Sequence, residues 1–561
     1  MRTTLVVERA FRDCVELGGD ADDTPSLYLW RNSEVSVERV LEAVESGRWA
    51  DLAEISGFFA GVYRAGGRVH LFCDRLGVYP LFYRIEGQAV HVAPVIGSIR
   101  DAASTAPSPC KEGVVSLLLF GHHLANETVY ETIKRCNGGH TVVIGSDGRI
   151  AQTILWKKEH RYNEKPMITV DQLGELCVSA VRNAVDDATN VLVGLSGGFD
   201  SRAVLGGLME CVDVERIRAI TFGGPDTSDF KIGKCVSDAA GIQHTAFPIL
   251  DNYFDDAFLR QRSTDYSHTY SAFATQPARM IRFLSEQEGT YDASLWGVGG
   301  DAISGSHLHD GDDNLPPCVD SAARAKLLTS RLYIPVAVVS EIVGIEPGEI
   351  EAMVAVLLER SGLPAYDESW QFLDAWDIFV RGRMELIGVL PFDTESWRCP
   401  HLSGEYFEQM ASLCFSQKLH QAAYKEMLAH RFAALFSLPT KRLQGRSLVS
   451  DKGLTRSEFA LRAARARGLL LRAINLAPDS VDRNYAKDRV FFRSSTGRDR
   501  LQYYAAILRE QEVVSCSADR LVALAENHVQ VARMAGTIAY AFGTCGDTAD
   551  DLRQDLQPCL Q

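Results

Sequence analysis

The first third of the chain alternates short apolar runs with turn residues, a pattern typical of antiparallel sheet. Four strands are predicted between Leu52 and Ile99, and one more hairpin follows around Gly148. The predicted strands are Phe58–Tyr63, Val69–Cys73, Leu81–Tyr83, Ala89–Val92, Thr141–Ile144 and Ile150–Leu155. Before them, Val35–Val44 places its apolar residues on one face of a helix. The polar stretch Lys157–Lys165 predicts a linker.

From Met167 onward the pattern changes to alternating helices and strands. Val170–Ala184 has the periodicity of an amphipathic helix, and Val191–Leu195 is a continuous apolar run of the kind found in buried parallel strands. Further apolar runs at Ile217–Phe222 and His244–Ile249 are separated by helical segments. This alternation predicts a doubly wound parallel sheet covered by helices.

Beyond Asp320 the pattern is mostly helical, with Pro439, Pro478 and Gly543 as expected breaks. The predicted fold class is therefore α/β, with an antiparallel N-terminal sandwich, a doubly wound parallel-sheet domain and a helical C-terminal region. We expect these three domains to span residues 1–160, 167–455 and 456–561.

Composition narrows the classes of function. The chain has 561 residues and a formal net charge of −15, which argues against nucleic acid as a partner because a polyanion needs a basic face. No apolar run is long enough for a membrane span, and the charges in MRTTLVVERAFRDC do not fit a signal peptide. The 13 cysteines include no CxxC pair, which favours scattered reduced thiols over a zinc site. We therefore expect a cytoplasmic protein.

A glycine-rich turn, Ser196-Gly197-Gly198-Phe199-Asp200-Ser201, lies between a buried strand and a helix. Glycines let backbone N–H groups approach phosphate oxygens, and the start of a helix stabilises an anion. The serines add hydroxyl donors, whereas Asp200 fits Mg²⁺ that bridges the phosphates. No GKS or GKT follows, so we expect the loop to hold the pyrophosphate of ATP as a leaving group. The predicted binding residues are Leu195, Ser196, Gly197, Gly198, Asp200 and Ser201.

Two further turns extend this predicted ATP site. The turn Trp296-Gly297-Val298-Gly299-Gly300-Asp301 follows an apolar run and ends in a second carboxylate. Asp200 and Asp301 are therefore predicted to hold one Mg²⁺, while Gly299 and Gly300 offer N–H donors. The strand end at Thr221, Phe222 and Gly223 is placed for the base or ribose. A surface turn and a plain strand-to-helix turn are the respective alternatives.

Together these motifs resemble the synthetase domain of asparagine synthetases. The likeness covers roughly residues 170–455 and rests on LSGGFDS, ITFGG, GVGGD and Arg398-Cys399-Pro400-His401-Leu402. Gly57-Phe58-Phe59-Ala60 and the later DRLGVYPLFY look like the glutaminase domain of these enzymes, an Ntn-type fold. The resemblance implies that ATP, with Mg²⁺, activates a carboxylate as an acyl-adenylate, which an amine then attacks.

The chain departs from the glutamine-using members of that family. Those enzymes carry a nucleophilic cysteine directly after the initiator methionine, where this chain has Arg2. Cys14 is internal and has no α-amino group to act as its base. The resemblance therefore implies a degenerate glutaminase-like domain and an amine that does not come from glutamine. Lasso-peptide cyclases and the β-lactam and carbapenam synthetases are relatives of this kind, in which an amine of the same substrate attacks.

Two positions bear on the choice among these relatives. Val298 lies where the β-lactam enzymes have a tyrosine that helps deprotonate the amine, which weakens that interpretation. Ser396 stands where asparagine synthetases have glutamate, and Glu395 is either its shifted equivalent or a surface charge. We expect closure of a peptide macrolactam, as in lasso-peptide antibiotic biosynthesis. The alternatives are a β-lactam- or carbapenam-type synthetase, an intermolecular amide synthetase, and an asparagine synthetase-like enzyme that uses free ammonia.

The resemblance also implies a cation near the end of the synthetase domain, for which Lys441 and Arg446 are candidates and solvated loop charges the alternative. Asp377 and Glu385 are candidate bases for the amine. The expected substrate is a peptide or a small amino-acid-derived molecule, and a partner protein of a peptide-maturation complex is a further expectation. We expect the arginines of Arg456–Arg472 to form a solvated helix face or to contact an acidic peptide or partner.

Two rivals come from other classes. A tRNA-modifying pyrophosphatase would use the same kind of loop, but the negative net charge and the lack of CxxC argue against it. A scaffold protein with an empty loop would have no reason to keep Ser196, Asp200, Ser201 and Asp301 together.

Overall fold

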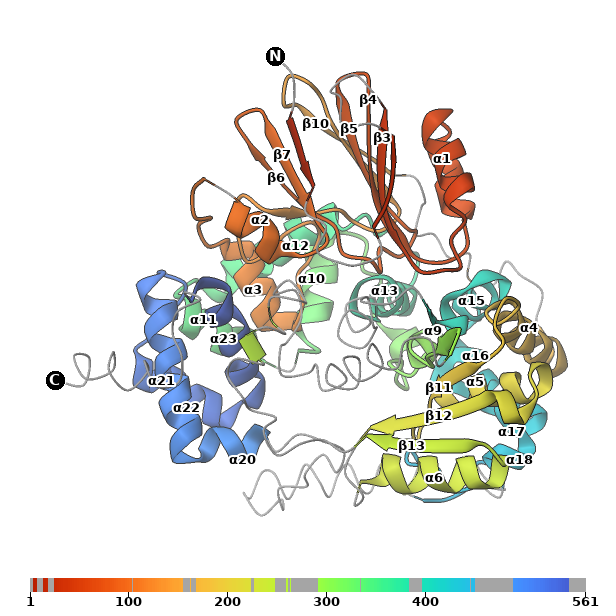
Figure 1. The fold of residues 1–561 in the computed structure, drawn as a ribbon. Coiled ribbons are helices and arrows are strands. Elements are labelled where there is room, and N and C mark those ends of the chain that lie inside the picture. Colours follow the sequence, from red (N-terminus) through yellow and green to blue (C-terminus); the bar gives the residue numbers. More distant parts are fainter. Residues whose placement is uncertain are drawn as a thin grey trace.

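The computed structural model shows N-terminal sheets, then a parallel sheet with helices, then a helical C-terminal region (Figure 1). It describes residues 4–7, 14–18, 25–102, 104–154, 162, 168–222, 227–247, 259–260, 263, 291–332, 334–382, 396–443, 445–449 and 488–543. Within these ranges, no helix has the length and apolar character needed to cross a membrane.

Two sheets form the N-terminal region. The larger is antiparallel, with the strand order β10-β9-β5-β4-β3-β2. Its strands are β2 (Cys14–Gly18), β3 (Ser26–Arg31), β4 (Phe59–Ala65), β5 (Arg68–Cys73), β9 (His140–Ile144) and β10 (Ile150–Ile154). The smaller sheet, ordered β1-β7-β6-β8, contains β1 (Thr4–Val7), β6 (Phe82–Glu86), β7 (Ala89–Ala93) and β8 (Lys134–Arg135). All six predicted strands are present with small shifts at their ends, whereas β1, β2, β3 and β8 were not predicted.

Strand β3 is apolar on both faces because both faces are covered. Leu27 and Leu29 pack beneath helix α1 (Val37–Glu45), which confirms the helix predicted there. Tyr28 and Trp30 alternate with them and belong to the main core. Continuous apolar character of this kind lacks the period of two that marks a half-exposed strand.

The parallel sheet has the order β13-β12-β11-β14-β15 and confirms the predicted doubly wound fold. Its strands are β11 (Val191–Gly194), β12 (Ile217–Phe222), β13 (Gln243–Phe247), β14 (Ala293–Leu295) and β15 (Trp397–Arg398). Helices α4 (Val170–Asn183) and α5 (Asp200–Cys211) pack on each other, while α6 (Ser228–Ala240) packs on β12 and β13. The chain winds outward from β11 through β12 and then returns to β14 on the other side. The carboxyl ends of β11 and β14 therefore form the switch point where such folds bind ligands.

Helices predominate after β14, as the sequence predicts. They are α9 (Gly300–Ile303), α10 (Ser321–Thr329), α11 (Val336–Val343), α12 (Pro347–Arg360), α13 (Ser369–Trp376), α15 (Gly404–Ala411), α16 (Phe415–Lys418), α17 (Ala422–Arg431) and α18 (Ala433–Phe436). The C-terminal group contains α20 (Asp488–Arg493), α21 (Ser495–Glu510), α22 (Ala518–Asn527) and α23 (Val529–Phe542). The expected breaks at Pro439 and Gly543 are present, and Pro478 lies outside the described residues.

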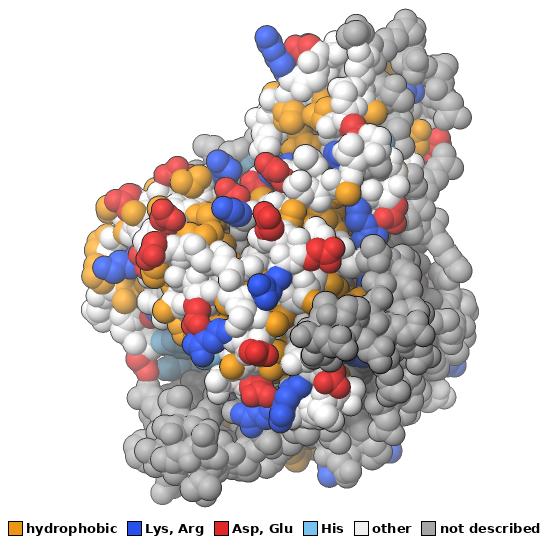
Figure 2. Space-filling view, turned by 90° about the vertical axis from the view of Figure 1, so that its left-hand side faces the viewer, with side chains coloured by type: hydrophobic (Ala, Val, Ile, Leu, Met, Phe, Trp, Pro, Cys, Tyr) orange, Lys and Arg blue, Asp and Glu red, His pale blue; other side chains and the backbone are white. Residues whose placement is uncertain are grey.

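The C-terminal helices lie against the N-terminal region. Helix α23 packs on α3 (Lys111–Phe120), and the Tyr130 hydroxyl donates to the Ala541 carbonyl at 2.5 Å. Figure 1 shows this group on the opposite side of the molecule from α6. On the face shown in Figure 2, acidic and basic side chains are interspersed with apolar ones.

The N-terminal region also docks on β15 of the parallel sheet. The ring of Phe58 stacks on Trp397 with a centroid distance of 5.3 Å and an interplanar angle of 15°. Asn32 donates from Nδ2 to the Trp397 carbonyl at 3.1 Å, and Arg75 pairs with Glu408 at 2.6 Å. These contacts place residues of the two regions directly against each other.

Candidate ATP site

The two glycine-rich loops follow β11 and β14 and lie against each other at the switch point. Gly194 ends β11 beneath the Trp296 ring, where a Cβ atom would come within 2.8 Å of ring carbon. A Cβ on Gly297 would lie 2.5 Å from the backbone nitrogen of Ser201. Side chains at these two positions would therefore push the loops apart.

Hydrogen bonds inside the first loop fix its shape. The backbone N–H of Ser196 donates to Ser201 Oγ at 3.0 Å, and that of Gly198 donates to Ser196 Oγ at 3.1 Å. The two serine hydroxyls lie 3.1 Å apart. Helix α5 then begins at Asp200 without a side-chain cap, so its first N–H groups face the loop mouth as donors for an anion. The serines therefore shape the loop, and their role as hydroxyl donors to phosphate stays a prediction.

Asp200 and Asp301 lie close enough to influence each other. Gly300 sits against the Asp200 carboxylate, since a Cβ there would be 2.6 Å from Oδ1. Burial and the charge of Asp301 raise the pKa of Asp200 to about 7, against the opposing effects of Tyr424 and Arg442. Two facing carboxylates next to a helix start fit a hard divalent cation, which would relieve their repulsion. The residues therefore fit the predicted Mg²⁺ site.

Lys441 is anchored to the first loop by Asp229, a residue that the sequence did not single out. Its ammonium group donates to Asp229 Oδ2 at 3.0 Å, and Asp229 Oδ1 accepts the Gly197 N–H at 2.9 Å. The Lys441 N–H also donates to the Gly197 carbonyl at 2.9 Å. The Lys441 side chain is 38% exposed, so its charge remains open to a ligand. Arg446 is exposed nearby on the same turn.

The remaining predicted nucleotide residues are only partly described. Thr221 Oγ1 donates to the Leu195 carbonyl at 2.7 Å and contacts His244 Nε2 at 2.9 Å, so it ties β12 to the first loop. Phe222 ends β12. Gly223 and the candidate base Glu385 lie outside the described residues, as do Glu395 and the arginines between 456 and 472.

Asp377 lies in a buried ionic cluster behind the second loop. Its carboxylate pairs with Arg381 and, at 2.9 Å, with His307 Nδ1. The other His307 nitrogen lies 3.2 Å from Asp374, which also pairs with the fully buried Lys418. The facing His307 and Arg381 charges hold the pKa of Asp377 well below its usual range. This carboxylate is a poor proton acceptor, so the structure gives no support to the prediction that Asp377 is the base.

Two further residues, distant in sequence, hold Asp200. The Tyr424 hydroxyl donates to Asp200 Oδ1 at 2.9 Å, and His401 Nε2 donates to the Asp200 carbonyl at 3.2 Å. Burial lowers the pKa of His401 to about 4, so the ring is neutral and carries its proton on Nε2. His401 belongs to the segment Arg398–Leu402 that carries the family resemblance, but its contact with Asp200 was not predicted, and Tyr424 lies in no motif that the sequence singled out.

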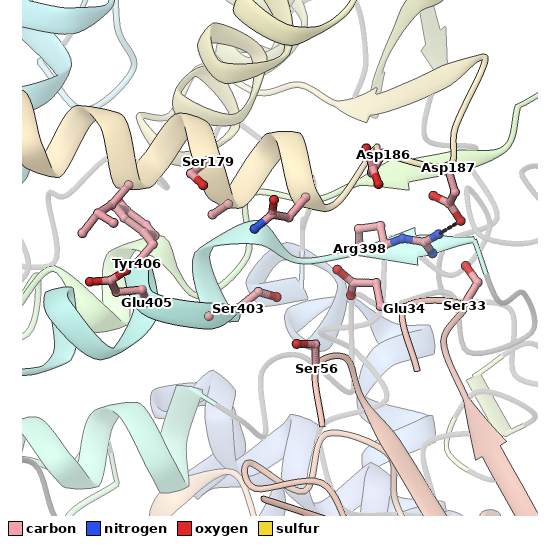
Figure 3. A pocket seen from close by; sticks show the side chains of 14 residues that line it. Ser33, Glu34, Ser56, Ser179, Asp186, Asp187, Arg398, Ser403, Glu405 and Tyr406 are labelled. Carbon is pink, nitrogen blue, oxygen red and sulfur yellow. Dashed lines mark ion pairs between the residues drawn. The ribbon is translucent and has the colours of Figure 1, made fainter. Parts of the chain in front are cut away.

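A cavity lies away from the two loops. It has a volume of about 560 Å³ and is bounded by the N-terminal region, α4 and the segment from Arg398 to Tyr406 (Figure 3). Glu34, Asp187 and Glu405 contribute carboxylates, and Arg398 pairs with Asp187 at 3.6 Å. No residue of the two glycine-rich loops lines this cavity.

Comparisons with known proteins agree with the two-region arrangement. A model of the glutamine amidotransferase domain matches residues 30–156, and a model of asparagine synthase matches residues 172–335. A search of curated proteins finds no match.

Among solved structures, the chain is similar to NMN synthetase from Francisella tularensis at 15% identity, over 35% of this chain and 92% of that one. It is also similar to a glutamine-dependent NAD⁺ synthetase from Acinetobacter baumannii in complex with ADP, at 14% identity over 49% and 66% of the two chains. Both TM-scores are 0.20, and these likenesses carry no argument about the site.

Proposed function

The chain is a member of the asparagine synthetase family and an ATP-dependent ligase, and from that premise we propose that it closes an amide within a peptide. In this proposal ATP activates a side-chain carboxylate of the peptide, and the N-terminal amine of the same peptide attacks it. The observation that carries the proposal is the pair Asp200 and Asp301 at the mouth of two interlocked loops, with Lys441 fixed beside them.

The first step is adenylation. A carboxylate oxygen of the substrate attacks the α-phosphorus of ATP, and the bond to the pyrophosphate oxygen breaks. The first N–H groups of α5 face the negative charge that develops on the phosphates. Asp200 and Asp301 would hold Mg²⁺, which supplies further charge neutralisation at the phosphates when bound.

The second step forms the amide. The amine nitrogen attacks the acyl carbon, AMP leaves with the bonding electron pair, and the amine loses its proton to water. Lys441 supports this step because Asp229 holds its ammonium beside the phosphate loop, where it stabilises the charge on the departing AMP. An acyl-adenylate is reactive, so enclosure of a nearby amine supplies much of the required acceleration.

Three described thiols of the N-terminal region, those of Cys14, Cys73 and Cys110, support an amine source other than glutamine. Cys14 lies within β2, paired with Trp30, and has no α-amino group. Burial raises the pKa of Cys110 to about 12, and the pKa of Cys73 also lies well above its usual range. Thiols with such pKa values are poor nucleophiles.

The choice of a macrolactam over a β-lactam rests on Val298. This side chain is partly buried and packs against the main core. Valine offers no proton donor or acceptor, so the second loop provides no general base at that position. A prefolded peptide, whose amine is already close to the carboxylate, is the substrate that depends least on such a base.

Mass spectrometry with candidate peptides tests the proposal. Each peptide should have a free N-terminal amine and an internal Asp or Glu, and a matched control should carry an acetylated N-terminus. We expect a product lighter by one water and one AMP per closure, and no product from the acetylated peptide. A product joining two separate peptides, or one containing added ammonia, would overturn macrolactam closure and leave adenylation intact.

A further inference from the structure

The short turn Pro400–Leu402 touches both carboxylate loops at once. Its His401 donates from Nε2 to the main-chain carbonyl of Asp200 at 3.2 Å. Its Leu402 side chain packs on Gly299, where a Cβ atom would come within 2.6 Å. Gly299 directly precedes the helix that carries Asp301. One rigid turn therefore contacts the segments that bear both carboxylates.

His401 is an unusual residue for a purely structural position. The residue is 1% exposed, and its ring contacts the rings of Tyr406 and Tyr424 at centroid distances of 5.8 and 6.3 Å. Within the described part of the chain, the ring's Nδ1 is buried without a hydrogen-bond partner. Burying an imidazole costs free energy that the single bond to Asp200 only partly offsets. A phenylalanine or leucine would fill such a core position at lower cost.

We propose that His401 is a positioning residue that fixes the main chain of Asp200, and that the turn Pro400–Leu402 thereby sets the separation of Asp200 from Asp301. Tyr424 completes the arrangement, because its hydroxyl orients the Asp200 carboxylate from a different helix. The inference rests on the proposed role of the two aspartates as ligands of a divalent cation. A cation held by two protein carboxylates is sensitive to their spacing.

Mn²⁺ serves as the probe, because its paramagnetism reports binding without any turnover. Affinity for Mn²⁺ in the presence of ATP is measured by electron paramagnetic resonance for the wild type and for His401→Leu, His401→Gln and His401→Asn. Gln places an amide N–H near the position of Nε2, whereas the shorter Asn does not reach it. His430→Leu, an exposed histidine on α17, is the matched control.

We expect His401→Leu and His401→Asn to weaken Mn²⁺ binding by up to about tenfold, the upper end of the range for one lost neutral hydrogen bond. His401→Gln should recover most of that loss, and ATP binding in EDTA should stay unchanged in every variant. Equal Mn²⁺ affinity in the folded His401→Leu variant and the wild type would overturn the inference. If His401→Leu does not fold, equal affinities for the Gln and Asn variants would overturn it.

Asp200→Asn separates this inference from the proposed function. If Asp200→Asn loses Mn²⁺ while the His401 variants keep it, only the positioning role of His401 fails. If Asp200→Asn binds Mn²⁺ as the wild type does, the cation site itself is wrong and the inference falls with it.

Discussion

Asp200 joins several contacts of the candidate ATP site. It begins helix α5, faces Asp301, and accepts a hydrogen bond from Tyr424. Replacement by Asn keeps the size and the contact with Tyr424 but removes a charged cation ligand. We expect Asp200→Asn and Asp301→Asn each to slow pyrophosphate release about 100-fold or more. Asp313→Asn, an exposed aspartate after the second loop, should have no effect. Wild-type turnover in either active-site variant would contradict the assignment.

Lys441 and Arg446 differ in how the structure holds them. Asp229 fixes Lys441 against the phosphate loop, whereas Arg446 is exposed. We expect Lys441→Ala to block amide closure, and Arg446→Ala to reduce it less. Hydroxylamine should still trap the activated acid in Lys441→Ala if adenylation survives, which liquid chromatography with mass detection would show. A Lys441→Ala variant that closes the ring at the wild-type rate would remove lysine from the mechanism.

At the residue scale, the sequence identifies those site residues that lie in short local motifs. The serines, glycines and aspartates of the two loops form short motifs, so they could be predicted. His401 and Tyr424 reach Asp200 across 201 and 224 residues, and Asp229 reaches Lys441 across 212. Such contacts depend on tertiary packing, which a single sequence does not encode as a local pattern. Asp377 looked available as a base because its partners His307 and Arg381 could not be placed from the sequence.

At the element scale, the cluster behind α9 makes stability depend on pH. His307 lies between Asp374 and Asp377, with Lys418, Arg381 and Tyr162 also facing these carboxylates. Despite burial, the two aspartates raise the pKa of His307 from 6.5 to about 9. Because the folded pKa is raised, protonated His307 stabilises the fold fully below the unfolded pKa of 6.5. This stabilisation is lost as the pH rises through the folded pKa of about 9.

The thermal midpoint should therefore decrease as the pH rises from 6.5 to 9, because the fold loses about 3 kcal/mol of stabilisation over this pH range. The pKa values of Asp374 and Asp377 are lowered, so their contribution is present above the unfolded carboxyl pKa and is lost in acid. His307→Asn should be less stable throughout and should flatten the alkaline decline, which differential scanning fluorimetry across this pH range would measure. The exposed residue His430, which lies outside this cluster, gives a control position. An unchanged slope of stability against pH in His307→Asn would refute the cluster's role.

Elements were predictable where their apolar pattern had one clear period. The helix at Val37–Glu45 shows such a period, whereas the strands on either side of Gly66 were predictable from the turn residues between them. Strand β15 has two residues, too few for any pattern, yet it joins the sheet and carries Trp397. Strand β3 escaped prediction because helix α1 and the second sheet cover it on opposite faces.

At the scale of the whole molecule, the N-terminal region supports the ATP site through Trp397. Phe58 stacks on Trp397. Three residues after Trp397, the chain enters the turn whose histidine donates a hydrogen bond to the Asp200 carbonyl. Phe58→Ala should destabilise the protein by about 3–5 kcal/mol and also weaken ATP binding.

Phe59→Ala is the matched control, because Phe59 is equally buried but faces α1. It should cost similar stability without changing affinity for ATP, as isothermal titration would record. An equal loss of ATP affinity in both variants would mean that general destabilisation, and not docking on Trp397, is responsible.

The domain boundaries themselves remain a prediction, although the described contacts show that the three regions pack together.

The products formed from ATP test the central claim most directly. The claim is that the paired loops present the α-phosphorus of ATP to a carboxylate. ATP labelled at the α- and γ-phosphates would be incubated with an active peptide whose carboxylates carry oxygen-18. The account predicts AMP and pyrophosphate, with one labelled oxygen transferred from the peptide to AMP. ADP and inorganic phosphate, or AMP without the label, would contradict it.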